Sequence, residues 1–163
     1  MVAKFDLQKW SAIAEILSSI AVLATLVFLV LELQQTNDAV RANTYQEMNA
    51  VIQDFNAMFL ANPEVVEFIA KTSSDDYELD TEEAMRLRAF ISSTYRYAEN
   101  VYFQYEIGTI TEQQMKSLLH GVVLNFRRRG RLRTEWENGD DKFLLSPGTV
   151  EYLEHAIYRT ETN

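Results

Sequence analysis

The sequence predicts an all-α protein, with one transmembrane helix near the N-terminus that continues into a helical bundle domain. Two observations support this fold class. The stretch from Ser11 to Leu31 is almost wholly apolar and holds one charged side chain, that of Glu15. As a helix it would be about 31 Å long, which matches the hydrocarbon core of a bilayer. In addition, the chain has only five Gly and two Pro, the residues that most often interrupt helices.

The apolar stretch has two alternative interpretations, a buried helix of a soluble protein and a cleaved signal peptide. A buried helix usually has a polar face, whereas this run contains no Lys, Arg, Asn, Gln or Pro. Lys4 and Lys9 resemble the charged leader of a signal peptide, but the run is long for one and no small-x-small cleavage site follows it. Trp10 stands at its edge, where an indole ring prefers the membrane interface. We therefore interpret residues 11–31 as a retained anchor and residues 1–10 as a tail at the membrane surface.

One face of the predicted span is small or polar. The alternating steps of three and four along this face give the 3.5-residue repeat of a left-handed helix pair or ring. In lipid, small residues and hydroxyls are the usual signal for helix association. With one span per chain, the partner must be another chain, and we expect a homo-oligomer. The predicted oligomer seam comprises Ser11, Ala14, Glu15, Ser18, Ala21, Thr25 and Phe28.

Glu15 is the one ionisable residue in this stretch, and a carboxylate inside a membrane marks a functional site by default. Three roles stay open for it. Glu15 lies about one turn from Trp10, so its carboxyl could reach the headgroups; it could bond across the helix interface; or it could handle ions.

Residues 32–163 are predicted to form an α-helical soluble domain. The span should continue as one helix to Ala61, because no Gly or Pro interrupts it, and Asn62-Pro63 should start a short helix. We expect a long helix from Glu82 to about Ile107, with Thr81 as its cap and Gly108 closing it.

Three further features complete the predicted domain. Thr111 and Gln114 form a capping box for the next helix, which the arginine-rich turn around Gly130 should interrupt. The segment NGDDK should be a loop, and Ser146-Pro147 should open the last helix. The apolar positions of the two central helices predict a buried stripe consisting of Leu87, Phe90, Ile91, Thr94, Ala98, Val101, Tyr102, Tyr105, Met115, Leu118, Leu119, Val122, Val123 and Phe126.

Composition and motifs exclude several classes of function. A net charge of −9 argues against generic nucleic-acid binding, which depends on neutralising phosphates. The absence of cysteine excludes disulfides, cysteine-ligated zinc and a cysteine nucleophile. His120 and His155 are isolated, and the acidic segment from Asp75 to Glu83 lacks the spacing and the glycine of a calcium loop. We therefore predict no catalytic residues, no cofactor and no metal site.

A basic segment near the C-terminal end could contact lipid or an acidic partner. It consists of Arg127, Arg128, Arg129, Arg131 and Arg133. Three interpretations stay open: structural pairing with the acidic segment or with a helix end, binding of anionic headgroups, and, least favoured, nucleic-acid binding. A second polar group, Arg96, Glu99, Asn100 and Gln104, lies on the tyrosine-rich helix. It predicts a polar network within the bundle or, alternatively, a ligand pocket.

Three segments carry a resemblance to a known family. They are LQQTNDAVRANTYQE after the span, RYAENVYFQYEIGTIT, and Trp136 followed by FLLSPGTVEYLE. The chain resembles a family of small, uncharacterised bacterial single-span membrane proteins with a C-terminal helical domain. Their aromatic helix has the form F/Y-R-x-x-E-N-x-Y-x-Q-Y. The resemblance implies a bacterial source and a membrane-anchored helical fold, and it implies no activity.

The topology prediction weighs two signals. Lys4, Lys9 and the amino terminus carry more positive charge than Arg41, which favours a cytoplasmic N-terminus and an external domain. The family's juxtamembrane segment is usually more basic than this one and implies the reverse. We expect the bacterial inner membrane, with the domain in the cytoplasm.

For function, we expect a homo-oligomeric scaffold or regulator that contacts itself, the lipid bilayer and a further protein. The alternative is a small homo-oligomeric pore or ion channel lined by the polar face of the span, with Ser11, Glu15, Ser18 and Thr25 along a central path.

Overall fold

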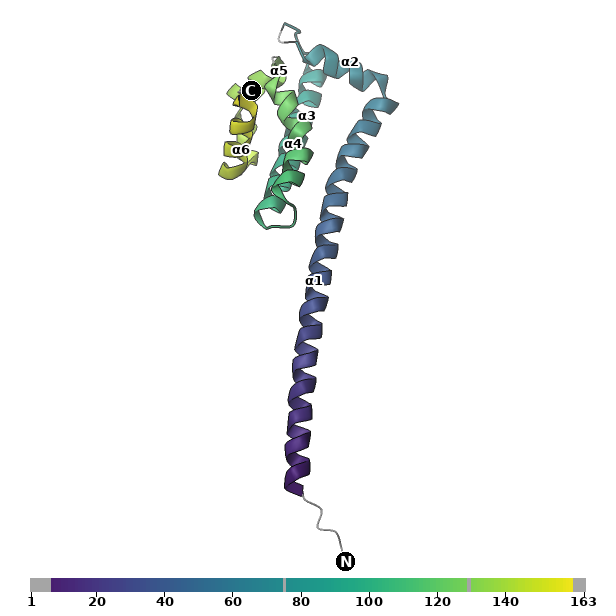
Figure 1. Cartoon of the computed structure of the whole chain (residues 1–163). Helices are drawn as coiled ribbons and strands as arrows, with labels where there is room; N and C mark the ends of the chain where they lie inside the picture. The colour runs from purple at the N-terminus through teal and green to yellow at the C-terminus, as the bar shows by residue number, and fades with distance from the viewer. Residues whose placement is uncertain (1–6, 75, 129, 160–163) are drawn as a thin grey trace, which may run out of the picture. The chain divides into compact units, whose positions relative to one another are not determined.

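A computed structural model describes residues 7–74, 76–128 and 130–159, and within these residues the fold is all-α, as predicted. Figure 1 shows the helices in chain order. Contacts divide the chain into two compact units, Met1–Ala42 and Asn43–Asn163. Helix α1 contributes to both units, and all the other helices belong to the second.

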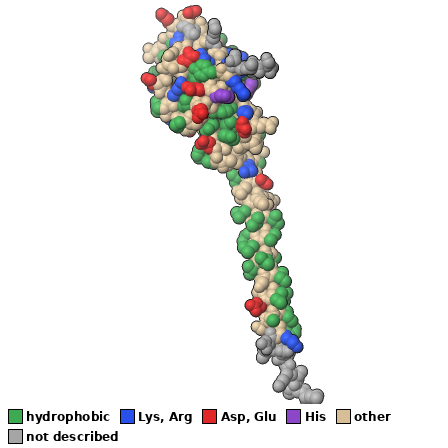
Figure 2. Space-filling view, turned by 60° about the vertical axis from the view of Figure 1, so that its left-hand side comes forward, with side chains coloured by type: hydrophobic (Ala, Val, Ile, Leu, Met, Phe, Trp, Pro, Cys, Tyr) green, Lys and Arg blue, Asp and Glu red, His purple; other side chains and the backbone are tan. Residues whose placement is uncertain are grey.

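Helix α1 runs from Leu7 to Ala61 as one element of 55 residues, which confirms the prediction that the span continues to Ala61. It is the one helix in the described residues that is long and apolar enough to cross a membrane, and none of its most apolar window is buried. Figure 2 shows hydrophobic side chains along this part of the helix. The pattern is that of a helix whose apolar surface needs a cover from outside the described chain.

The second unit contains five further α-helices and one 3₁₀-helix. After α1 come α2 (Pro63–Thr72), α3 (Thr81–Glu106), α4 (Glu112–Arg127), α5 (Arg131–Asn138), η1 (Asp140–Leu144) and α6 (Pro147–Tyr158). Helix α4 contacts both α3 and α6, and η1 contacts α3. The core therefore lies between α3, α4 and α6.

Three aromatic rings form the centre of this core. Tyr95, Phe126 and Trp136 come from α3, α4 and α5, and their ring centroids lie 5.6 to 5.7 Å apart. All three side chains are fully buried. Aromatic pairs at such distances contribute about 1 kcal/mol beyond the burial of their area. The aromatic cluster thus joins three helices that are distant in sequence.

The predicted buried stripe is confirmed for α4 and only in part for α3. All six predicted α4 residues are buried, as are Leu87, Ile91, Ala98 and Val101 on α3. Phe90, Thr94, Tyr102 and Tyr105 are half-buried. Tyr95, which the predicted stripe omitted, is buried instead.

The start of α2 at Asn62-Pro63 is confirmed, whereas the predicted cap of α3 and one predicted loop are wrong. The N-cap of α3 is Asp80 rather than Thr81, because the Asp80 carboxylate accepts the backbone N–H of Glu83 at 2.8 Å in a capping box. Asn62 occupies the N-cap position of α2, but its amide donates back to the Met58 carbonyl instead of capping. The NGDDK segment enters the 3₁₀-helix η1.

The other predicted boundaries are confirmed. Thr111 and Gln114 form the capping box of α4, and Ser146 caps α6 ahead of Pro147. Gly108, with a φ of 78°, follows α3. Gly130, with a φ of 123°, separates α4 from α5. A Cβ at Gly130 would overlap the carbonyl of Ser73, in the turn after α2. The backbone of the arginine-rich turn therefore lies directly against the end of α2.

Within the second unit, the C-terminal part of α1 packs against α3 through few side chains. The sulfur of Met48 lies 3.9 Å from Asn100 Nδ2, and the rings of Phe55 and Phe90 are 5.6 Å apart. Residue numbers rise along α1 as they fall along α3, so the two helices are antiparallel. Met48 is the only buried residue of α1 among those described.

Candidate functional site

The predicted seam residues all lie on α1 and are exposed in the single chain. Two of their three hydroxyls, those of Ser18 and Thr25, bond to their own helix. Ser18 Oγ donates to the Ala14 carbonyl at 2.8 Å, and Thr25 Oγ1 donates to the Ala21 carbonyl at 2.9 Å. A hydroxyl that bonds to the carbonyl one turn earlier needs no water or partner to donate to. Ser18 and Thr25 can therefore lie against an apolar surface without leaving an unpaired donor.

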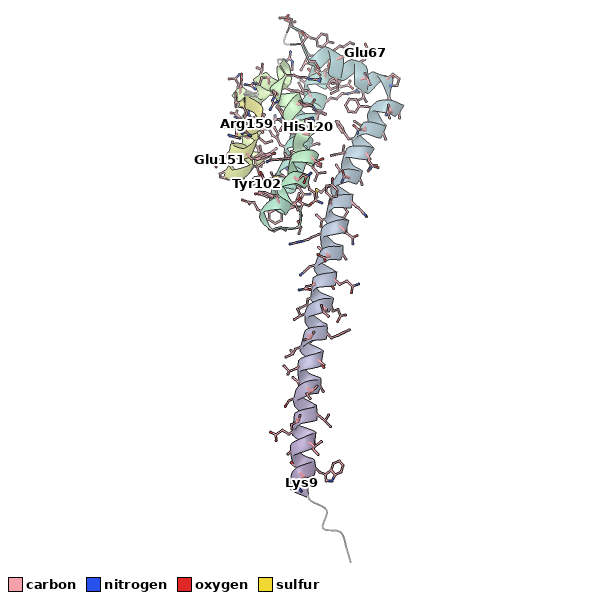
Figure 3. The ribbon with its side chains drawn as sticks, in the orientation of Figure 1. Lys9, Glu67, Tyr102, His120, Glu151 and Arg159 are labelled. Atoms are coloured by element: carbon pink, nitrogen blue, oxygen red, sulfur yellow. The ribbon has the colours of Figure 1, made fainter. Side chains whose placement is uncertain are left out.

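The remaining seam residues differ in character. Glu15 is exposed, and its backbone carbonyl accepts the hydroxyl of Ser19 at 2.9 Å. Phe28 also projects from the helix uncovered. Lys9 is labelled at the N-terminal end of α1 in Figure 3, with the apolar stretch following it along the helix. The seam is thus a continuous strip of one helix, with its one charged residue, Glu15, toward the N-terminal end.

The arginine segment is largely engaged inside the domain. Arg127 Nη2 donates to the Ala156 carbonyl near the end of α6 at 2.7 Å. Arg131 Nη2 donates to the Tyr77 carbonyl. Arg133 pairs with Glu137 at 2.6 Å, and its guanidinium lies 4.2 Å from the centroid of the Tyr158 ring. These contacts tie the ends of α4, α5 and α6 together.

The exposed part of this segment is smaller than the sequence suggests. Arg127 and Arg128 are exposed, whereas Arg131 and Arg133 are half-buried. Arg129 lies outside the described residues. The link to the acidic segment passes through the Tyr77 carbonyl rather than a carboxylate. Of the described arginines in this segment, Arg127 and Arg128 are therefore the exposed ones that could contact a lipid or an acidic partner.

The acidic segment serves the start of α3. Besides the Asp80 cap, the Glu83 carboxylate accepts the hydroxyl of Tyr77 at 3.0 Å and the backbone N–H of Asp80 at 3.2 Å. Caps of this kind stabilise a helix by about 1 kcal/mol. Asp75, at the start of the segment, lies outside the described residues. The carboxylates of Asp80 and Glu83 therefore have a structural use at the start of α3.

The polar residues of the tyrosine-rich helix α3 bind separate partners. Glu99 accepts the backbone N–H of Ser146 at 2.7 Å and so holds the start of α6. Asn100 contacts Met48 of α1, and Gln104 accepts the hydroxyl of Thr109 at 2.6 Å in the turn after α3. Arg96 is exposed. Their shared role is to attach neighbouring elements to α3, and they do not converge on one pocket.

A groove that the sequence did not predict lies between the acidic segment, α3, α5 and η1. It has a volume of about 800 Å³. Its floor includes Leu87 and Ile91, and its rim carries charged residues of both signs. Asp141 pairs with Arg88 at 3.4 Å. No sequence signal marks this groove, because its walls meet only after η1 folds back onto α3.

Two carboxylates that line this groove influence the pKa of a buried tyrosine, Tyr95. Burial raises the pKa of the Tyr95 hydroxyl far above its ordinary value, and the carboxylates of Asp141 and Glu135 raise it further. Tyr95 therefore stays neutral and acts as a packing residue. The groove brings together no nucleophile with an adjacent base among the groups that line it.

The histidines and acidic residues of the described chain do not form a metal site. His120 and His155 are exposed on α4 and α6, and Figure 3 labels His120 together with Arg159 just after the end of α6. Across residues 7–74, 76–128 and 130–159, no group of three or more His, Asp or Glu side chains is placed to hold a metal ion.

Comparison with known proteins finds no matching family model, no matching curated protein and no matching solved structure. The resemblance to single-span bacterial membrane proteins therefore stays a prediction.

Tyr97 generates a testable prediction about pH. Its hydroxyl is buried without a hydrogen-bond partner among the described residues, and burial raises its pKa to about 12, with Tyr45 adding to the effect. The unfolded chain would lose this proton near pH 10. The contribution of Tyr97 to stability is thus fully present below about pH 10 and is lost as the pH rises through about 12.

Replacing Tyr97 with Phe removes the unpartnered hydroxyl. We expect Tyr97→Phe to raise the free energy of unfolding at neutral pH by about 1 kcal/mol. It should also reduce the loss of stability between about pH 10 and 12, measured by thermal unfolding in detergent. Tyr158→Phe, which removes an exposed hydroxyl, is the matched control. Equal alkaline destabilisation of the wild type and Tyr97→Phe would contradict the assignment.

Proposed function

We propose that this protein is a membrane-anchored homo-oligomer whose helical domain acts as a scaffold or regulator by binding other proteins. The observation that carries the proposal is the uncovered apolar helix α1, one face of which carries small residues between Ser11 and Thr25, with the hydroxyls of Ser18 and Thr25 already bonded to the helix backbone. Helices in lipid associate through such faces because they permit close approach of the backbones.

The exposed apolar side chains of the domain support a role in binding proteins. Leu60 is 88% exposed, and Met85 and Phe143 are also largely uncovered. Large apolar side chains that gather on a surface mark interaction sites more often than isolated ones do. The described pockets, by contrast, are shallow or are lined by charged residues that pair with one another. They therefore give less support to an enzyme.

The location that fits this proposal is the bacterial inner membrane, crossed once, with the domain in the cytoplasm. The support comes from the single spanning candidate and from the family resemblance in the segments around it. The test is protease treatment of spheroplasts that carry a C-terminal epitope tag on the chain. We expect the tag to survive until the membrane is permeabilised, and its loss from intact spheroplasts would place the domain outside.

The seam generates a prediction about assembly. Ala21→Leu places a bulky side chain where two backbones should approach, so we expect a smaller particle in mild detergent. Ile20→Leu changes the opposite, lipid-facing side and should leave the particle size unchanged. Size-exclusion chromatography with light scattering measures both variants. If both retain the wild-type mass, the seam assignment is wrong.

Glu15 separates the scaffold from the alternative pore. In a pore, Glu15 would keep its charge in water and favour cations, as acidic rings do. The internally bonded hydroxyls of Ser18 and Thr25 favour the dry seam. We expect wild-type protein in planar bilayers to carry no cation current, and Glu15→Gln to assemble as the wild type does. A cation current that Glu15→Gln abolishes would support the pore instead.

A further inference from the structure

The C-terminal part of α1 carries an exposed stripe that is both apolar and acidic. Glu47, Val51, Asp54 and Met58 follow one another at steps of four, three and four, so they share one face of the helix. Val51 is 51% exposed and Met58 is 39% exposed. Neither carboxylate forms an ion pair with another described residue. We call these four residues the acidic stripe.

Helix α3 carries a stripe of the same spacing and the opposite charge. Met85, Ala89, Ser92 and Arg96 also follow at steps of four, three and four, and we call them the basic stripe. Arg88 and Phe143 line the same shallow hollow, and their side chains are 74% and 77% exposed. Asp141 lines this hollow too and pairs with Arg88 at 3.4 Å, so Arg96 is the cation of the hollow that has no ion pair with a described residue.

The two stripes lie on the same side of the α1–α3 pair. On each helix, the stripe lies about a quarter of a turn around the helix axis from the residues that make the α1–α3 contact. On α1, for example, Met48 and Phe55 each come one residue after a member of the stripe. Because the helices are antiparallel, equal rotations of this kind bring both stripes to one side. The antiparallel order also places Glu47 toward the level of Arg96, and Met58 toward the level of Met85.

We propose that two copies of the chain pair through these stripes, with the acidic stripe of each copy on the basic stripe of the other. A two-fold axis along the helices keeps the α1 segments of both copies running in the same direction. It sets Glu47 against Arg96, and Met58 against Met85 and Phe143 of the other copy. Asp54 then lies toward Arg88, which also pairs with Asp141 of its own chain. The four helix segments then form a four-helix bundle with two identical contacts.

A second copy fits this surface better than other occupants for two reasons. The stripes match in spacing along the helix, and each supplies the charge that the other lacks. An anionic lipid surface would attract the basic stripe and repel the acidic stripe beside it. The pairing rests on the proposed homo-oligomer and adds a contact outside the predicted span.

The chain has no cysteine, so introduced cysteines report this contact without background. We would co-express the full-length Val51→Cys and Ser92→Cys chains with tags of different size, oxidise the membranes briefly, and look for a mixed dimer on a non-reducing gel. The control replaces Ser92→Cys with Glu151→Cys, on the exposed side of α6. We expect the mixed dimer with Val51→Cys and Ser92→Cys and none with the control.

Charge reversal tests the specificity of the pairing. Adding Glu47→Arg to the Val51→Cys chain sets two arginines against each other and should lower the cross-linked fraction roughly tenfold. Adding Arg96→Glu to the Ser92→Cys chain should restore it. A mixed dimer that is insensitive to Glu47→Arg would overturn the pairing. No mixed dimer, from protein of wild-type oligomer mass, would overturn it and leave the seam standing, whereas a monomeric wild type would refute the proposed homo-oligomer itself.

Discussion

The first part of helix α1 exposes a long apolar surface, and the need to cover this surface is the main physical constraint on the molecule. The backbone of the stretch from Ser11 to Leu31 is paired within the helix, so hydrocarbon imposes no unpaired backbone groups on it. Its side chains, however, are uncovered, and at about 25 cal/mol per Å² such a surface is costly to hydrate. Lipid and neighbouring helices are the covers that meet both conditions.

In the domain, helices α2, α5 and α6 have only 10, 8 and 12 residues, and helices of this length are marginally stable alone. Helices α5 and η1 together contribute little apolar surface except Trp136, which is fully buried between Tyr95 and Phe126. Around this ring cluster, arginines and glutamates attach helix ends to their neighbours. Arg133 and Glu99 are the clearest examples, since each reaches an element distant from its own helix.

Local signals explain which parts of the fold could be predicted. Thr111 with Gln114 and Ser146 with Pro147 act within one turn of the chain, so the sequence predicts the starts of α4 and α6. Asp80 and Thr81 are both good caps, and the choice between them depended on Glu83 reaching back to Asp80. Tyr95 lies four residues after Ile91, so the spacing on α3 allows either Thr94 or Tyr95 in the buried stripe. The rings of Phe126 and Trp136, which pack against Tyr95, decide between them.

The candidate sites, too, could be predicted only where local spacing along one helix defines them. The seam residues could be selected because they lie on a single helix, where spacing alone defines a face. The groove beside Asp141 and the partners of Arg127 and Arg131 arise from segments far apart in the sequence. Their geometry depends on how η1 and α6 fold back, and a helical repeat does not encode that.

The contact of Gly130 with Ser73 bears on the order in which the domain assembles. Here two backbone segments touch with no side chain between them, and they are separated by the whole of α3 and α4. Closing so long a loop reduces the entropy of the chain, and this cost must be met before the contact can stabilise the fold. Helices α3 and α4 pair through more local contacts, so we expect the contact between α5 and the turn after α2 to form later. The position of α5 therefore depends on a turn that lies two long helices earlier in the chain.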